Sequence, residues 1–293
     1  MKCKSALLVA GVAYLGLAAS AIAQQAMLTP PKILVIAREV VKTGKAAPHA
    51  KWEAGWPRAF AKAKWPVHYL AASSITGESR VLFFTGYESL AAWEEDNANI
   101  GKNSALSAET AMLAEKDADY LTESKTAVFT YMPDLSYQAD MPLAGIRGFV
   151  VLAQHVKPGH GKHFEEIRKM VRAAHEKAGL SDHYSVYQVR AGAPGGTYLI
   201  FVPFKSLAEA DQFDSIHGKS YKDALGEDGQ KAIQDFAAQG LESGETQLLT
   251  FSPSMSYVSK EWVDSDKDFW SPKAAPMAKP ATKKDDMKEE KKP

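Results

Sequence analysis

The chain has 293 residues, of which 45% are hydrophobic and 24% are charged, and these proportions are ordinary for a globular protein. Its 35 basic residues balance 35 acidic ones, so the sequence predicts no strongly basic surface and no nucleic-acid partner. A chain of this length can bury one large core or two smaller ones.

The first 23 residues have the three parts of a secretory signal peptide. Lys2 and Lys4 form a positive start, residues 6–19 are small and apolar, and residues 21–23 (Ala-Ile-Ala) fit a cleavage pattern. A membrane anchor is the alternative, but the apolar run is shorter than the roughly 20 residues that a span needs. We therefore expect a mature chain that starts near Gln24, is extracytoplasmic (periplasmic or secreted), and has no membrane attachment after cleavage.

The only cysteine is Cys3, which precedes the apolar run. The mature chain would therefore have no thiol and no disulfide, and its stability must come from packing alone. This excludes cysteine nucleophiles, thiolate metal sites and thiol redox chemistry. Loss of Lys2 and Lys4 also changes the charge balance from 35 against 35 to 33 against 35.

The chain from residue 32 to residue 137 is predicted to form a strand, a helix, two strands, a helix and a strand. The apolar run at residues 33–37 is typical of a strand covered on both faces. Trp52, Trp56 and Phe60 recur at helical spacing in a helix predicted over residues 48–63, which Pro57 should kink or restart. The other predicted elements are a hairpin that starts at His68, a helix over 88–97, a turn over 97–103, a helix over 105–121 and a strand over 126–131.

The same order of elements returns from residue 147 to residue 258, after a linker over residues 138–146. The stretch that begins His68-Tyr69 and ends Ser89-Leu90-Ala91 reappears about 115 residues later, beginning His183-Tyr184 and ending Ser206-Leu207-Ala208. Each copy predicts a β-hairpin followed by a helix, and a repeat outweighs any local signal. The other predicted elements of this half are a strand over 149–153, helices over 161–178 and 230–241, and a strand over 247–251.

A C-terminal extension over residues 259–293 follows the second repeat. It contains Trp262 and Trp270, which we expect to pin it to the body of the protein; contact with a partner is the alternative. After about residue 271 it is composed mainly of Ala, Pro, Lys, Asp and Glu. Such a composition buries too little apolar surface to offset the entropy of ordering, so we expect disorder there.

Each repeat has the β-α-β-β-α-β order of a ferredoxin-like unit, an antiparallel sheet with both helices on one face. In the first hairpin, Leu82 and Phe84 point to one side and Val81 and Phe83 to the other, so both faces need cover. Helices cover one face, and the other repeat is the natural cover for the second. We expect an α+β fold in which the two sheets face each other as a barrel within one chain. Such a chain is a monomeric pseudo-dimer, and further oligomerisation is allowed.

The segment from Leu82 to Trp93 resembles the aromatic-x-Ser-Leu-x-x-Trp segment of antibiotic-biosynthesis-monooxygenase-like proteins, which belong to the dimeric α/β-barrel superfamily. Residues 204–210 resemble it less closely, since Ala210 stands in place of the tryptophan. The resemblance covers both repeats and implies a barrel of two facing sheets. It implies no single activity, because the superfamily includes cofactor-free monooxygenases, heme-degrading enzymes, heme peroxidase-like members, isomerases and sensors.

The heme-degrading branch of this superfamily uses an Asn on the first strand, a Trp on the second helix and a His further along the chain. Here the corresponding residues are Ala37, Trp93 and Asn103, so only the tryptophan matches. This pattern argues against heme degradation and favours Trp93 as a core residue. We expect no cofactor, and heme is the alternative.

Two histidines are the main candidates for binding a ligand, because the repeat places His68 and His183 at equivalent positions. If the repeats face each other, a pseudo-twofold axis relates the two imidazoles, which could bind a ligand or move a proton near pH 7. The alternative is that each His-Tyr pair merely begins a strand. The further candidates are Tyr69 and Tyr184 beside the histidines, Arg38 at the end of the first strand, and Trp93.

A second group of histidines, His155, His160 and His163, lies close together in the sequence. A metal site usually needs three or four ligands with ordered partners, and the first repeat has nothing that matches this group. A solvated loop is the better interpretation, so we expect no metal site.

Three classes of function remain open, and the sequence does not decide whether the chain is an enzyme. The first is an exported barrel that binds a small apolar or aromatic molecule, with a cofactor-free monooxygenase-like reaction as its catalytic form. The second is a heme-binding member of the superfamily. The third is a non-catalytic interaction or stress scaffold. We place the function between the two sheets, because ligands usually bind in apolar concave sites that hold a few polar groups.

Overall fold

The computed structural model describes residues 27–211 and 218–271, so the predicted signal peptide and disordered tail lie outside the described residues. The strands of the first repeat are β2 (Ile33–Val41), β3 (Tyr69–Ser74), β4 (Arg80–Tyr87) and β5 (Leu121–Tyr131). Its helices are α1 (Ala46–Glu53), α2 (Gly55–Ala63), α3 (Leu90–Lys102) and α4 (Ser104–Asp117).

The second repeat has the same order of elements. Its strands are β7 (Gly148–Val156), β8 (Ser185–Ala191), β9 (Thr197–Phe204) and β10 (Leu241–Phe251), and its helices are α5 (Gly161–Ala178), α6 (Leu207–Ala210) and α7 (Lys219–Gln239). Two short strands pair with each other. β1 (Met27–Leu28) precedes β2 in the chain, and β6 (Met141–Pro142) lies in the predicted linker. The C-terminal extension forms α8 (Lys260–Ser265) and α9 (Lys267–Trp270).

All eight long strands form one closed antiparallel barrel, in the order β10-β3-β4-β2-β5-β8-β9-β7 around the ring. Each half of the ring has the strand order of a ferredoxin-like sheet. The last strand of each repeat pairs with the second strand of the other: β5 with β8, and β10 with β3. The expected α+β fold, with two facing ferredoxin-like sheets in one chain, is confirmed.

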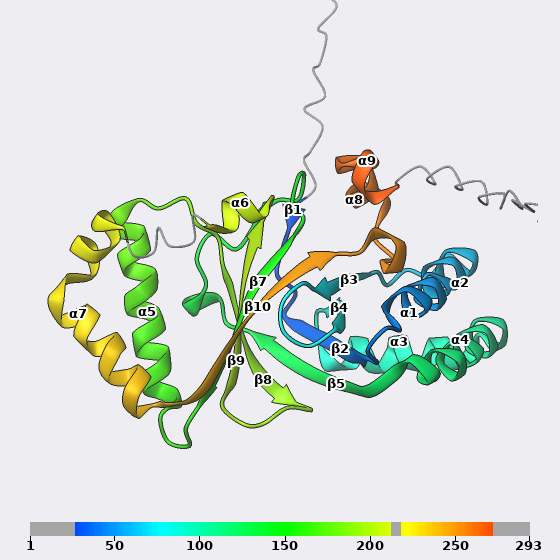
Figure 1. Cartoon of the computed structure of the whole chain (residues 1–293), viewed down its shortest axis with the longest axis horizontal. Coiled ribbons are helices and arrows are strands. Elements are labelled where there is room, and N and C mark those ends of the chain that lie inside the picture. Colours follow the sequence, from blue (N-terminus) through cyan, green and yellow to red (C-terminus); the bar gives the residue numbers. More distant parts are fainter. Residues whose placement is uncertain (1–26, 212–217, 272–293) are drawn as a thin grey trace, which may run out of the picture.

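The helices lie outside the barrel, on opposite sides for the two repeats. Figure 1 shows α5 and α7 beside one half of the ring and α1 to α4 beside the other. Because the helices cover only the outer face of each sheet, the inner faces pack against each other, as the two-sided apolar pattern of the hairpins predicts. No helix within residues 27–211 and 218–271 is long and apolar enough to cross a membrane.

Alternation along β2 shows how the sequence divides the two faces. Leu34 and Ile36 belong to the core inside the barrel, whereas Ile33 and Val35 pack beneath the helices of the first repeat. Aromatic rings fill much of the interior; Phe84 contacts Phe201 edge-on, with ring centroids 5.7 Å apart. The middle of the barrel is therefore a packed core, and open space is left toward one end.

The boundaries of several elements differ from those predicted. The helix expected over residues 48–63 is interrupted at Ala54, so Pro57 falls in the first turn of α2, where its missing N–H is tolerated. The turn expected over residues 97–103 is wrong: α3 continues to Lys102, and the side chain of Asn103 caps α4. β5 starts at Leu121, five residues earlier than predicted, because pairing with β2 extends a segment that has little apolar character of its own.

The extension that follows the second repeat closes against the barrel, as predicted for its tryptophans. Trp270 is buried in the interior core, where its ring stacks on Phe251 with centroids 6.0 Å apart. Arg147 pairs with Asp266 at 2.7 Å and lies 4.2 Å from the centre of the Phe269 ring. These contacts hold α8 and α9 over one end of the barrel.

Candidate functional site

A cavity of about 460 Å³ lies at one end of the barrel. Inward-facing residues of both sheets line it, among them Leu34, Phe84, Phe149, Tyr187 and Phe201. Its edge is made by the segment before β2, the residues that lead into β3 and β8, and the start of α8. A concave and largely apolar site within about 300–1,000 Å³ is typical of small-molecule binding.

Both predicted histidines line this cavity. His68 is exposed at the edge, and its ring stacks on Tyr257, with centroids 4.7 Å apart and planes 20° apart. His183 lies just before β8, and its Nδ1 is 2.6 Å from the backbone carbonyl oxygen of Gln138. The repeat therefore places two imidazoles from different sheets at the same end of the barrel.

The surroundings of each ring indicate how it can act. Because a carbonyl oxygen only accepts hydrogen bonds, Nδ1 of His183 donates to Gln138, which leaves Nε2 of the neutral ring as an acceptor. Partial burial lowers the pKa of His68 below its ordinary value, against the opposing effects of Glu261 and of the Pro66 backbone. A neutral His68 can accept a proton or a hydrogen bond from a bound molecule.

The neighbouring tyrosines contribute less than predicted. Tyr69 and Tyr184 border the cavity, but their rings extend beneath the helices on the outer face of the sheet. The Tyr69 ring contacts Phe60 of α2, and the Tyr184 ring contacts His175 of α5, with centroids 5.8 Å and 5.3 Å apart. Their hydroxyl groups therefore do not serve the cavity as polar groups.

The structure does not bring Arg38 and Trp93 to this cavity. Arg38 follows Leu34 and Ile36 in the alternation of β2, but it lies further along the strand and pairs with Glu123 of β5. Trp93 packs against the outer core around Val35, so it lies on the opposite face of the sheet. These two residues therefore do not lie with the histidines, because strand direction separates Arg38 from the cavity and the face of the sheet separates Trp93 from it.

Trp262 is the main cavity residue that sequence reasoning did not assign to the site. It lies in α8 and lines the cavity together with Val258 and Ser259. Its position after the second repeat pointed to a pinning role, which Trp270 fulfils. Only the path of the extension across the end of the barrel brings Trp262 to the cavity.

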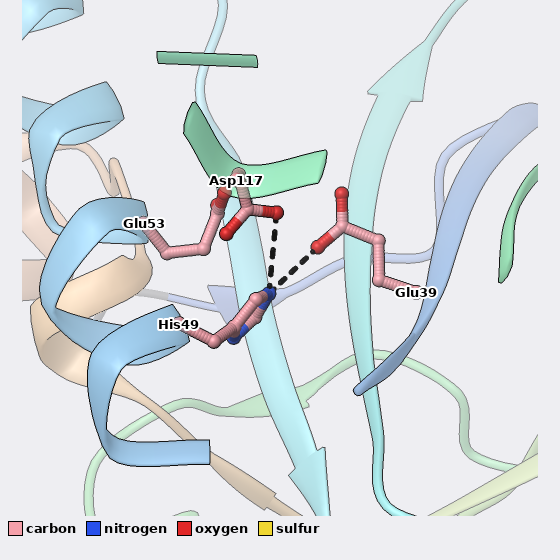
Figure 2. A group of neighbouring side chains, drawn as sticks. All are labelled: Glu39, His49, Glu53 and Asp117. Atoms are coloured by element: carbon pink, nitrogen blue, oxygen red, sulfur yellow. Dashed lines mark hydrogen bonds and ion pairs between the residues drawn. The ribbon is translucent and has the colours of Figure 1, made fainter. Parts of the chain in front are cut away.

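A second group of polar side chains is buried between the sheet and the helices of the first repeat (Figure 2). Glu39 comes from β2, His49 and Glu53 from α1, and Asp117 from the end of α4. His49 Nε2 is 3.0 Å from Glu39 Oε2 and 3.6 Å from Asp117 Oδ2. We call these four residues the buried acidic cluster. It lies on the outer face of the sheet, whereas the cavity is inside the barrel.

Burial raises the pKa of two acids of this cluster, Glu53 and Asp117. Burial, together with Glu39 and Asp117, raises the pKa of Glu53 to about 9. Burial also raises the pKa of Asp117 to about 6, with His49 acting in the opposite direction. One signal for the cluster was present in the sequence: His49 and Glu53 lie four residues apart on a predicted helix and so share one face.

No protein-family model matches the sequence, and no curated protein does either. Comparison of structures does find related folds. An anthrone oxidase-like protein aligns with a TM-score of 0.54 and 11% identity, over 80% of this chain and 98% of its own. A proposed monooxygenase from Fusobacterium nucleatum aligns with a TM-score of 0.52 and 14% identity, over 76% of this chain and 94% of its own. The chain therefore has the fold of the dimeric α/β-barrel superfamily.

Proposed function

We propose that this chain is an exported α/β-barrel protein that binds a small apolar or aromatic molecule in the cavity at the end of its barrel. The observation that supports this most directly is the convergence of His68 and His183 on one largely apolar cavity of about 460 Å³. If each His-Tyr pair served only to begin a strand, the structure would not need a cavity where the two imidazoles lie. The signal-peptide pattern of residues 1–23 supports export.

The arrangement also suits a cofactor-free oxygenation. An aromatic substrate with an acidic C–H or O–H group loses a proton to a neutral imidazole, and the resulting electron-rich anion can react with O₂ directly. His68 has a lowered pKa and His183 presents Nε2, so both can act as the base. The apolar walls would exclude water from the anion. The likeness to an anthrone oxidase-like protein motivates this choice of reaction.

Binding is tested with two probes, the fluorescent dye 8-anilinonaphthalene-1-sulfonate and anthrone. We expect saturable binding of the dye, competition by anthrone, and at least about fivefold weaker binding in His68→Ala and His183→Ala, because each removes a hydrogen-bonding group from the site. Ser185→Phe should abolish binding by filling the cavity, which Ser185 lines. The matched control is His163→Ala, an exposed position on α5 that does not line the cavity.

Oxygen uptake with anthrone tests the catalytic form separately. Consumption of O₂ that falls in both histidine variants would support an oxygenase, whereas binding without O₂ uptake would leave a binding protein. If neither probe binds the wild-type protein, the small-molecule proposal fails and an interaction scaffold becomes the better explanation. An absorption spectrum of the purified protein with added hemin distinguishes the heme-binding alternative, for which His68 and His183 are the imidazoles at the cavity.

A further inference from the structure

The buried acidic cluster brings more ionisable groups together than hydrogen bonding within it can satisfy. One imidazole faces three carboxylates, and one ligand atom from each residue lies within 4.8 Å of all the others. The side chain of His49 is 1% exposed and that of Asp117 is 4% exposed, so water can satisfy little of their hydrogen-bonding capacity. Burying carboxylates without full compensation costs several kcal/mol for each ion.

One atom of the cluster has no partner at all. Oδ1 of Asp117 is buried and accepts no hydrogen bond from any described residue. Figure 2 shows the Asp117 carboxylate facing His49 and Glu53, so this oxygen belongs to the space that the four side chains share. A buried carboxylate oxygen without a donor calls for an explanation, and a bound ion is one that also accounts for the other acids around it.

The second repeat shows that the fold itself does not require this cluster. β2 and β7 align residue for residue, so Glu39 corresponds to Gln154, and the same offset relates His49 to Phe164 and Glu53 to Arg168. In the second repeat no acid stands at these three positions: the Phe164 ring packs on that of Tyr198 with centroids 4.1 Å apart, and Arg168 lies over the Tyr184 ring. The acidic groups are therefore a feature of the first repeat alone and not a structural demand of the barrel.

We propose that the buried acidic cluster binds one divalent transition-metal ion, with Nε2 of His49 and one carboxylate oxygen each from Glu39, Glu53 and Asp117 as its ligands. Four ligands placed about 2.1 Å from an ion in a tetrahedron lie about 3.4 Å from one another. The distances from His49 Nε2 to Glu39 and Asp117, 3.0 Å and 3.6 Å, lie on either side of that value. Small side-chain rotations would bring the most widely separated pair of ligand atoms, which lie within 4.8 Å of each other, to this distance.

The ligand set selects the class of ion. An imidazole together with carboxylates suits Zn²⁺, Mn²⁺ or Fe²⁺ better than Mg²⁺, which prefers oxygen ligands and retains several waters. Four protein ligands leave no open position, so the ion would be structural and would hold β2, α1 and α4 together. The side chain of Glu39 is 16% exposed, more than those of His49 and Asp117, so an ion would enter the site past Glu39.

The test is binding of Zn²⁺ and Mn²⁺ to the EDTA-treated full-length protein, by calorimetry and by metal analysis after desalting. We expect one ion per chain and a rise in Tm of about 5–10 °C when the free ion is at about 100 times its Kd. Asp117→Asn and Glu53→Gln keep the size of the side chain and remove one anionic ligand, so each should weaken binding at least about tenfold. The matched control is Glu115→Gln, an exposed position two residues before Asp117 on α4, which should bind as the wild type does.

A second measurement separates loss of the site from loss of the fold. Without metal, Asp117→Asn and Glu53→Gln should melt at or above the wild-type temperature, because each replaces an ionisable carboxyl, which is costly to bury without a positive partner, by a neutral amide of the same size. Absence of stoichiometric Zn²⁺ and Mn²⁺ binding by the wild type would overturn the proposal. Unchanged binding in both ligand variants would overturn it as well, since the ion would then sit elsewhere, for example at His155 or His160. Equal weakening by Glu115→Gln would show general attraction to acidic surface instead of a site.

Discussion

Ser136 and Ser256 occupy equivalent positions in the two repeats, and each hydroxyl accepts a hydrogen bond from a strand of the opposite repeat. The backbone N–H of Val186 donates to Ser136 Oγ and that of Ala71 donates to Ser256 Oγ, both at 2.9 Å. Each serine follows the last strand of its own repeat, so the chain leaving one sheet is fastened to the second strand of the other. The pseudo-twofold relation of the barrel is thus visible in single hydrogen bonds.

Removal of either serine hydroxyl should destabilise the closed barrel. Ser136→Ala and Ser256→Ala each leave a buried backbone N–H without an acceptor, at a cost of about 1–3 kcal/mol in the free energy of unfolding. Urea denaturation followed by circular dichroism measures this. Ser254→Ala, two residues from Ser256 and exposed, is the control and should change the free energy by less than about 0.5 kcal/mol. Two variants as stable as this control would show that the cross-repeat bonds contribute nothing.

The architecture could be predicted from the sequence because three independent signals agree. The repeat fixes the order of elements, and the apolar residues on both faces of the hairpin, such as Leu82 and Val81, require cover on both sides. The helix over residues 161–178 matches α5, since Phe164, Ile167 and Val171 form a regular stripe and Gly179 ends it in the left-handed conformation. In the first repeat these signals are weaker and the helix boundaries differ from those predicted. In the second repeat α7 starts at Lys219, well before the predicted start at residue 230.

The site could be predicted only in part. Equivalence of the repeats predicted that His68 and His183 lie together, because symmetry brings equivalent positions to the same end of a closed barrel, and both line the cavity there. Arg38 and Trp93 could not be placed, since the sequence does not state which face a strand or helix presents to the interior. The buried acidic cluster could not be predicted for a related reason: Asp117 meets Glu53 only through the packing of α4 on α1.

Trp270 should be the main anchor of the C-terminal extension. Trp270→Ala removes a buried ring from the core inside the barrel, where it contacts Phe251 and Trp262, so the free energy of unfolding should fall by about 3–5 kcal/mol. Urea denaturation measures this loss. Asp268→Ala, an exposed neighbour in α9, provides the baseline. A loss no larger than that of Asp268→Ala would mean that the extension is not fastened by this ring.

Substitution of two other tryptophans should distinguish a residue of the cavity from a residue of the outer core. Trp262 lines the cavity and Trp93 lies on the outer face of the sheet, so Trp262→Ala should weaken binding of 8-anilinonaphthalene-1-sulfonate and Trp93→Ala should not. Trp93→Ala should instead lower the free energy of unfolding by about 2 kcal/mol or more, through the space it leaves. Both variants are titrated with dye under conditions in which each is fully folded. The reverse result, with dye binding lost only in Trp93→Ala, would move the ligand site to the outer face.

The pKa of Glu53 makes the stability of the metal-free protein depend on pH. Four ionisable groups face this carboxyl: Glu39 from β2, His49 from its own helix, Asp117 from α4, and Tyr69 from β3. The Trp56 side chain of α2 faces it as well. Burial and the two neighbouring carboxylates raise its pKa from 4.5 to about 9 in the folded state. Between these values the folded chain holds a proton that the unfolded chain has released. Unfolding therefore releases a proton, and rising pH favours unfolding by at most about 1.4 kcal/mol per pH unit.

Glu53→Gln should remove this dependence, because its amide does not ionise in either state. In EDTA, the free energies of unfolding of the wild type and the variant should be similar near pH 5 and diverge as pH rises, with the variant the more stable by several kcal/mol near pH 8. Urea denaturation at intervals from pH 5 to pH 9 measures the difference, in which groups common to both proteins cancel. Glu115→Gln should run parallel to the wild type throughout. Parallel curves for Glu53→Gln and the wild type would show that Glu53 ionises at an ordinary pH, and that its buried charge is compensated within the cluster without a bound proton.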